Sequence, residues 1–326
     1  MKCFISMFFM IILSISSNVT AAVNNKPSLA EENMLFMKNK ASFNQHDLLH
    51  FSSRSFKFLA IVPDGKTAEE TILFYRDIMI KKANEKGYSF TSGKKDLLFK
   101  IEQKHFLDTK DKLLDQQHLV IRQNYSQAHD SAITEKSESK LTVKKIAKNT
   151  PVPIIHSSLF TASNASNIKQ KTEENISADQ HGELQSYFEV TLSSKLSENM
   201  LKNNSINDYF SIHPELAKFG IAKDEKLIRQ IAYSTQMSPG KFTLPNGKTS
   251  SFDIEVWAST PDGKPILVEL AFDSEGYASS VEDLTLQEEF FVSAVLEGMH
   301  AYALPDATLM GSKLRALKAA SEQLTQ

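Results

Sequence analysis

The sequence predicts a mainly β protein whose strands form an eight-stranded antiparallel barrel with flanking helices. Runs in which apolar and polar residues alternate, the period of a half-buried strand, recur along the chain from residue 51 onward. Short polar turns, rather than long helices, separate most of these runs. A sheet with so many antiparallel strands removes its exposed edges when it closes on itself, which favours a barrel.

The first 22 residues have the pattern of a cleavable signal peptide. A positively charged start precedes an apolar run over residues 3–15, which is shorter than the ~20 residues needed to span a bilayer. Small side chains at Val19 and Ala21 suit cleavage after Ala21, and cleavage after Ala22 fits nearly as well. We therefore expect an exported protein, periplasmic or secreted, with no membrane attachment after cleavage. An uncleaved membrane anchor is the alternative.

Composition and charge narrow the classes of function. The only cysteine, Cys3, lies in the predicted signal peptide, so the mature chain would carry no disulfide and no thiolate metal ligand. The formal net charge is −2, which gives no whole-surface attraction for nucleic acid or for an anionic membrane. Any site for a polyanion must therefore be local.

The predicted barrel domain covers residues 51–302 and follows a polar N-terminal arm at 23–50. Its first strand, 51–60, ends in a Pro-Asp-Gly-Lys turn. Thr67 and Glu70 then have the spacing of a capping box, which predicts the start of a helix.

Seven further strands and two helices complete the predicted domain. The helices are expected over 208–218 and 281–297, and residues 303–326 are expected to form a helical tail. Two polar stretches, 126–139 and 149–186, are predicted to be insertions, and the second is too rich in Ser, Thr, Asn and Gln to bury a core of its own. The strands are expected at 97–107, 119–125, 140–146, 187–192, 227–235, 252–257 and 266–272.

Charged residues occupy alternate positions within many of these strands. One alternating face of a closed barrel points into its lumen, so the charged face would line a polar tunnel; exposure to solvent is the alternative that the period leaves open. In a tunnel, the basic residues would bind phosphate oxygens and the carboxylates would hold a hard divalent cation that bridges phosphates. The residues are Lys57, Lys100, Glu102, Lys104, Arg122, Lys140, Lys144, Arg229, Asp253, Glu255 and Glu269.

An ordered series of short motifs runs through the predicted strands. The motifs are Glu102-Gln103-Lys104-His105-Phe106-Leu107-Asp108-Thr109, Leu119-Val120-Ile121-Arg122, Leu141-Thr142-Val143-Lys144, the group Lys226, Arg229 and Tyr233, Phe252-Asp253-Ile254-Glu255, and Leu267-Val268-Glu269. In this order they resemble the CYTH or triphosphate tunnel metalloenzyme superfamily. The resemblance implies an eight-stranded antiparallel tunnel that binds triphosphate-containing ligands with the help of Mg or Mn.

The resemblance also implies roles for individual residues. Phosphate binding would fall to Lys57, Lys104, Arg122, Lys144 and Arg229, and metal binding to Glu255 and Glu269, with Glu102 as a further candidate. No catalytic residue is indicated. The family's first strand reads Glu-x-Glu-x-Lys, but here Ser53 and Ser55 stand in place of its two acids. Serine hydroxyls are poor substitutes for carboxylates around a hard cation.

Three functions compete at this stage. The first is metal-dependent hydrolysis of inorganic tri- or polyphosphate, which the ordered motifs favour. The second is a non-catalytic module that binds an anionic ligand without a metal, which Ser53 and Ser55 favour. The third is an interaction scaffold that reuses the barrel. Predicted export makes cytosolic ATP and thiamine triphosphate less suitable ligands than polyphosphate in the envelope or outside the cell.

Overall fold

A computed structural model describes residues 51, 53–93, 98–127, 139–148, 168–178, 183–196, 206–274 and 281–304. The predicted signal peptide (1–22), the N-terminal arm (23–50) and the C-terminal tail from residue 305 lie outside the described residues. So do 128–138 and 149–167 of the two predicted insertions.

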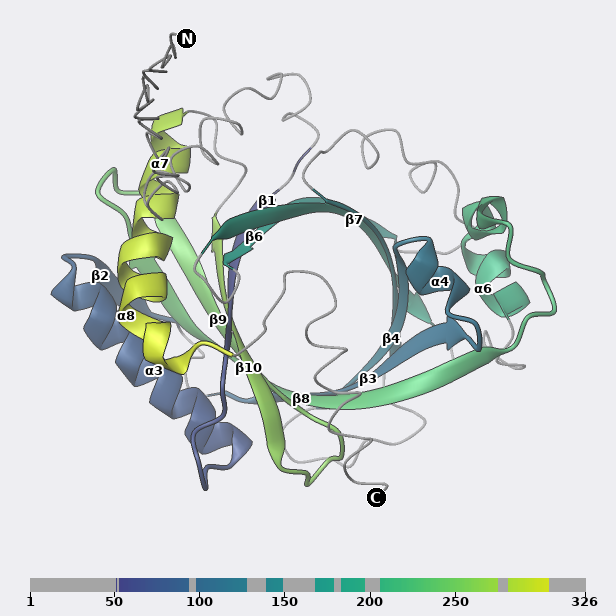
Figure 1. Cartoon of the computed structure of the whole chain (residues 1–326), viewed down its shortest axis with the longest axis horizontal. Helices are drawn as coiled ribbons and strands as arrows, with labels where there is room; N and C mark the ends of the chain where they lie inside the picture. Colours follow the sequence, from purple (N-terminus) through teal and green to yellow (C-terminus); the bar gives the residue numbers. More distant parts are fainter. Residues whose placement is uncertain are drawn as a thin grey trace, which may run out of the picture.

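Nine strands form a closed barrel, seen end-on in Figure 1. A short further strand, β2 (Ser89–Ser92), extends the sheet from one end of β8. Around the ring the order is β8 (Leu227–Thr243), β3 (Lys100–Thr109), β4 (Leu119–Gln127), β5 (Ser139–Lys148), β7 (Leu184–Leu196), β6 (Lys169–Ala178), β1 (Ser53–Ala60), β10 (Pro265–Ser274) and β9 (Thr249–Ala258), which pairs back to β8.

The predicted barrel class is confirmed, but the prediction of eight antiparallel strands is wrong. Strand directions cannot alternate all the way around a ring with an odd number of members, and the one parallel pairing falls between β1 and β6. The ninth strand, β6, lies inside the stretch 149–186 that composition marks as an insertion. Ile176 is its single large apolar residue: one face of the strand lines the polar lumen, and the other carries Glu174, which is ion-paired with Arg54.

A buried ion pair joins the two parallel strands. The Nε atom of Arg54 on β1 lies 2.8 Å from Oε2 of Glu174 on β6, and the two side chains are 2% and 0% exposed. A pair so deeply buried is costly to break from one side, because the remaining charge would be left without its partner away from water. This contact therefore ties β6 firmly into the barrel.

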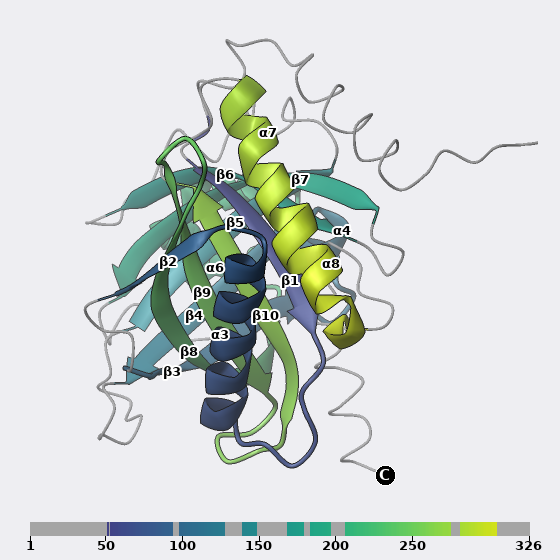
Figure 2. The ribbon, with the colours of Figure 1, turned by 90° about the vertical axis from the view of Figure 1, so that its left-hand side faces the viewer.

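Helices cover the outer face of the barrel on one side (Figure 2). The helix α3 (Ala68–Glu85) starts with the predicted capping box, in which the Glu70 amide donates to Thr67 Oγ1 at 3.2 Å and the Thr67 amide donates to Glu70 Oε2 at 2.9 Å. Beside it, α7 (Val281–Phe290) continues through a π-helical segment (Phe291–Leu296) into α8 (Glu297–Met299). Together they bury the larger apolar core against the outer faces of β1, β8, β9 and β10.

A second core lies against β3, β4, β5 and β7. It is covered by α4 (Leu113–Gln116), by α6 (Ile206–Ile212) and by a 3₁₀ helix (Pro214–Phe219). The single helix predicted over 208–218 is therefore two short helices, because Pro214 has no amide hydrogen to continue the first one. With apolar cores on the outside of the wall, the polar faces of these strands turn inward.

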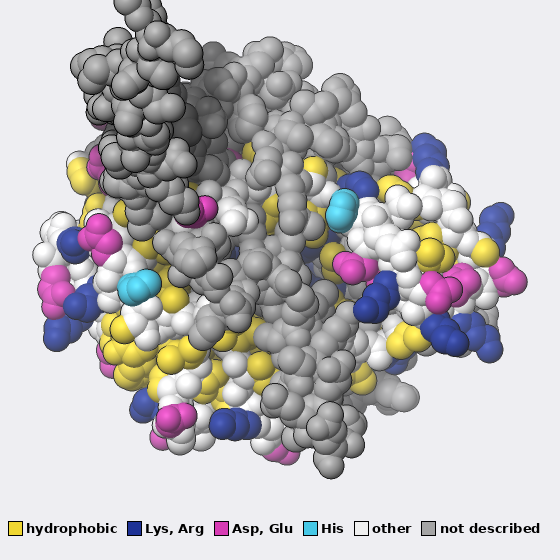
Figure 3. Space-filling model, in the orientation of Figure 1, with side chains coloured by type: hydrophobic (Ala, Val, Ile, Leu, Met, Phe, Trp, Pro, Cys, Tyr) yellow, Lys and Arg dark blue, Asp and Glu magenta, His cyan; other side chains and the backbone are white. Residues whose placement is uncertain are grey.

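Across the described part of the chain, no helix has the length and apolar character to cross a membrane. On the face seen in Figure 3, basic and acidic side chains are interspersed over the described surface. The charge that distinguishes this protein must be sought inside the barrel.

Candidate active site

Strand register decides which charged residues share the lumen. Side chains alternate along each strand, and paired residues on neighbouring strands lie on the same face. The pairs Lys104 with Asn124, Arg122 with Thr142, and Lys144 with Thr191 connect the inner faces of four strands. The opposite faces of these strands carry the apolar residues of the two outer cores. The lumen interpretation of the charge pattern is therefore confirmed.

Basic residues occupy one wall of the lumen, formed by β3, β4 and β5. Arg122 stands between the other cations of this wall and lowers the pKa values of Lys104, Lys140 and Lys144, after the larger effect of burial in each case. Its Nε atom is buried with no hydrogen-bond partner in the described part of the chain. The wall consists of Lys100, Lys104, Arg122, Lys140 and Lys144.

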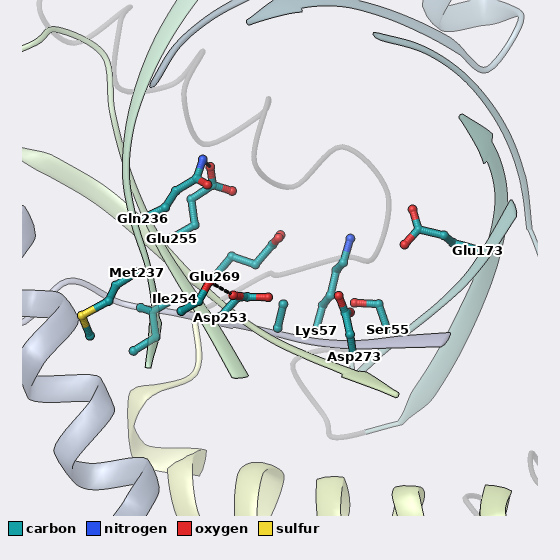
Figure 4. A pocket seen from close by; sticks show the side chains of 12 residues that line it. Ser55, Lys57, Glu173, Gln236, Met237, Asp253, Ile254, Glu255, Glu269 and Asp273 are labelled. Carbon is teal, nitrogen blue, oxygen red and sulfur yellow. Dashed lines mark hydrogen bonds between the residues drawn. The ribbon is translucent and has the colours of Figure 1, made fainter. Parts of the chain in front are cut away.

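Acidic residues gather on another wall, formed by β9, β10, β1 and β6. They surround a cavity of about 290 Å³ that also contains the Lys57 side chain (Figure 4). In that view Met237 and Ile254 point away from the ring, whereas the charged side chains point into it. The five carboxylates around the cavity are those of Glu173, Asp253, Glu255, Glu269 and Asp273.

Mutual repulsion shows that some of these acids are close together. Burial raises the pKa of Asp253, and the carboxylates of Asp273 and Glu255 raise it further. Glu255 and Glu269 lie directly opposite each other on β9 and β10. The Oδ1 atom of Asp273 is buried and accepts no hydrogen bond from any described residue. A bound cation would relieve the repulsion among these carboxylates.

Lys57 is the basic residue of the acidic wall. Burial would lower its pKa, but the negative groups around it, Glu269, Glu189 and Glu173 with the nearby Tyr187, outweigh burial and hold the pKa well above the ordinary value. Lys57 makes no direct ion pair within the described residues. It therefore stays charged at neutral pH and can reach an anion in the cavity.

Two other lysines of the lumen are paired with its carboxylates. Lys104 is 3% exposed; it forms an ion pair with Glu255, and its Nζ atom lies 3.4 Å from Oε2 of Glu102. The side-chain amide of Gln236 holds the same two carboxylates in place. Its Nε2 atom donates to Glu255 Oε1 at 2.7 Å and to Glu102 Oε2 at 3.1 Å. Farther around the ring, the Lys144 Nζ and Glu189 Oε1 atoms are 2.6 Å apart.

Arg229 is the one predicted phosphate-binding residue that the structure does not bring to the lumen. On β8 the inward residues are even-numbered, such as Ser234 and Gln236, and Arg229 lies on the other face, opposite Leu107. It is exposed there and lies near His105, whose pKa burial and the Arg229 charge lower to about 4. The position that the motif comparison assigns to phosphate binding is therefore one residue away from an inward position on β8.

Neighbouring strands supply acids beside the two serines of β1. Ser53 is paired with Glu173 on β6, and its Oγ atom donates to Glu173 Oε1 at 3.3 Å. Ser55 is paired with Asp273 on β10. The carboxylates expected on β1 thus have counterparts one strand to either side.

Sequence reasoning missed three acids of the lumen. Glu173 is hidden in the predicted insertion, and Asp273 follows directly after the predicted end of its strand. Glu189 could have been found, because it shares the inward period of its strand with Tyr187 and Thr191 while Phe188 and Val190 face the core.

A divalent cation fits the acidic wall by its chemistry. Within the described residues, no group of three His, Cys, Asp or Glu side chains is arranged to hold a metal ion. Mg²⁺, however, is commonly held by one or two carboxylates together with phosphate oxygens and water. The facing pair Glu255 and Glu269 meets that requirement.

Fold and site together define a closed β-barrel whose lumen carries a basic wall and an acidic wall. The amino-acid sequence itself matches no protein-family model and no curated protein. Among solved structures, the chain is similar to HpAC1 from Hippeastrum, which is named for adenylyl cyclase and described as having a dominant triphosphatase activity. The two are 11% identical, with a TM-score of 0.40, over 83% of this chain and 96% of that one.

Two further solved structures have comparable similarity. One, from Bacillus halodurans, carries the name of an adenylate cyclase: it is 10% identical, with a TM-score of 0.36, over 79% of this chain and 96% of its own. The other is the PH1819 protein of Pyrococcus horikoshii. It is 10% identical, with a TM-score of 0.31, over 80% of this chain and 98% of its own. At these values the functional argument depends on the residues of this chain's own lumen.

Proposed function

We propose that this protein is a divergent member of the CYTH superfamily that binds triphosphate or polyphosphate in its lumen and hydrolyses it with a divalent cation. One observation carries the proposal: a basic wall and an acidic wall face each other inside one closed barrel. A polyphosphate chain bound with a divalent cation presents both signs of charge. A surface that served only to attract anions would not need the carboxylates.

The basic wall would hold the phosphate chain. Arg122 has a buried Nε donor with no described partner, and Lys57 makes no direct ion pair in the described part of the molecule, so both can donate to phosphate oxygens. Lys104 and Lys144 would join them once their ion pairs with carboxylates open. These side chains would orient the phosphoanhydride bond for attack by water.

The acidic wall would hold the cation at Glu255 and Glu269, with Glu102 close by through its contacts with Lys104 and Gln236. When bound, Mg²⁺ or Mn²⁺ neutralises charge that develops on phosphate oxygens during transfer. Hydrolysis breaks one phosphoanhydride bond and adds one water across it. The predicted export to the periplasm or cell exterior would place this activity on extracellular polyphosphate.

Phosphate release tests the proposal. The mature chain, residues 23–326, is incubated with sodium tripolyphosphate and Mg²⁺ or Mn²⁺. We expect release of phosphate, and a loss of about a hundredfold in Lys144→Ala and in Glu269→Ala. Lys86→Ala, which removes a lysine from an ion pair outside the barrel, should behave like the unaltered protein. Release that is no faster than in the two lumen variants would contradict hydrolysis.

A non-catalytic binding module is the second candidate function. Ser53 and Ser55 favour it, because the first strand lacks the acids that the family places there. In that case calorimetry would show tripolyphosphate binding that is unaffected by EDTA, without turnover.

A further inference from the structure

Within the lumen, two lysines suited to binding phosphate are already bound to carboxylates. Lys104 pairs with Glu255 and Glu102, and Lys144 pairs with Glu189 at 2.6 Å. Lys104 and Glu189 are buried, with 3% and 2% of their side chains exposed. Arg122, by contrast, makes no ion pair with any described residue. The cations of the tunnel therefore differ in how available they are.

A phosphate chain that reaches Lys104 and Lys144 must displace these carboxylates. Each displaced acid would then be an unpaired negative charge beside a polyanion, which is unfavourable, and most strongly so for the buried Glu189. Gln236 holds Glu255 in place through its amide, so Glu255 cannot leave without losing that hydrogen bond as well. A cation that takes up the released carboxylates removes the penalty.

We propose that Glu255 and Glu189 are internal competitors of the ligand, which occupy Lys104 and Lys144 and make the binding of a phosphate chain and a divalent cation cooperative. This inference rests on the proposed function and specifies its regulation. Either ligand alone meets lysines and carboxylates that are already paired with each other at Lys104 and Lys144. Bound together, the two ligands replace each internal ion pair by a lysine–phosphate contact and a carboxylate–cation contact.

Calorimetry on the mature chain tests this coupling. The probe is a tripolyphosphate whose bridging oxygens are replaced by methylene groups, which cannot be hydrolysed and stands for tripolyphosphate in all titrations below. It is titrated with EDTA and again with saturating Mn²⁺, and Mn²⁺ is titrated with and without it. Both series are corrected for the complex that the two ligands form in solution. We expect each ligand to strengthen the other by about tenfold. The two factors should be equal, because a coupling free energy is reciprocal.

Two variants separate the competitor role from metal binding. Glu255→Gln removes the nearer of the two carboxylates that pair with Lys104 and leaves Glu102, so tripolyphosphate should bind about three- to tenfold more tightly in EDTA. The same change removes a proposed metal ligand, so the strengthening by Mn²⁺ should shrink. Glu189→Gln frees Lys144 and should also tighten binding in EDTA, but the strengthening by Mn²⁺ should shrink less than in Glu255→Gln, because Glu255 and Glu269 remain to hold the cation.

Glu297→Gln is the matched control. It removes one carboxylate from an ion pair with Lys86, at 3.0 Å, outside the barrel. Its affinity for tripolyphosphate should equal that of the unaltered protein. Circular dichroism establishes that each variant is folded before titration.

The results distinguish this inference from the proposed function. If folded Glu255→Gln and Glu189→Gln bind tripolyphosphate in EDTA no more tightly than Glu297→Gln, the competitor role is overturned while the tunnel remains a phosphate site. If tripolyphosphate and Mn²⁺ bind independently in the unaltered protein, cooperativity is overturned. If tripolyphosphate binds to none of the proteins under either condition, both proposals fail.

Discussion

Glu189 is a carboxylate of the lumen that is buried away from water. Burial opposes ionisation of its carboxyl group, yet Lys144 and Lys57 outweigh burial and keep the pKa of Glu189 below its ordinary range. Burial and the charge of Glu189 raise the pKa of Glu173 on the adjacent strand. The pKa values of these two paired acids are thus shifted in opposite directions.

A buried histidine predicts how stability responds to acid. His213 is fully buried, neither of its ring nitrogens has a hydrogen-bond partner among the described residues, and burial lowers its pKa to about 4. The unfolded chain takes up this proton near pH 6.5 and the folded chain only near pH 4. The free energy of unfolding should therefore fall as the pH drops from 6.5 to 4.

Replacing this histidine should reduce the acid sensitivity. Urea unfolding of His213→Phe between pH 7 and pH 4 should give a slope against pH that is shallower by up to ~1.4 kcal/mol per unit. His300→Phe, at an exposed histidine, should retain the slope of the unaltered protein. Parallel slopes for the His213 variant and the unaltered protein would show that His213 is not held neutral by burial.

At the scale of elements, β6 changes the barrel most. It supplies the ninth strand, the parallel seam with β1 and the inward acid Glu173. Its Ile176 side chain is fully buried in the larger core. A stretch that is polar by composition is therefore part of the fold.

Truncation of Ile176 tests that role. Ile176→Ala should lower the free energy of unfolding by ~2–4 kcal/mol, because it removes buried methyl groups and leaves a cavity. Gln170→Ala, at an exposed position of the same strand, should change it by less than ~0.5 kcal/mol. Urea unfolding measures both. A negligible effect of Ile176→Ala would mean that this segment is a disposable insertion.

Most of the barrel wall could be predicted from sequence because its strands alternate clearly. Phe56 and Phe58 alternate with Ser55 and Lys57, and the structure has this strand as β1. The polar strand β6 could not be predicted, because with Ile176 as its only large apolar residue no apolar face marks it.

The candidate site was predictable to the extent that alternation within a strand reveals it. Lys57, Lys104, Arg122, Lys144, Glu102, Glu255 and Glu269 all reach the lumen, whereas Arg229 faces outward. Which face of the long strand β8 lies inward depends on how β8 pairs with β3 and β9. A short sequence motif carries no information about that pairing. The same limit applies to Glu173 and Asp273, whose position beside Ser53 and Ser55 follows from pairing across strands.

At the scale of the whole molecule, charge is concentrated inside the barrel. The net charge of the chain is −2, and on the face seen in Figure 3 the described surface mixes both signs. Inside, cations on β3, β4 and β5 face acids on β9 and β10. The central claim is that this lumen binds a phosphate chain.

Two arginines on strands that flank β3 test that claim most directly. Arg122 on β4 faces the lumen and Arg229 on β8 faces outward. Calorimetry with Mn²⁺ and a tripolyphosphate analogue whose bridging oxygens are replaced by methylene groups should show binding weakened by about tenfold or more in Arg122→Gln, because a charge-assisted contact to phosphate is lost. Arg229→Gln should bind like the unaltered protein. Undiminished binding by Arg122→Gln, or an equal loss in both variants, would contradict the account.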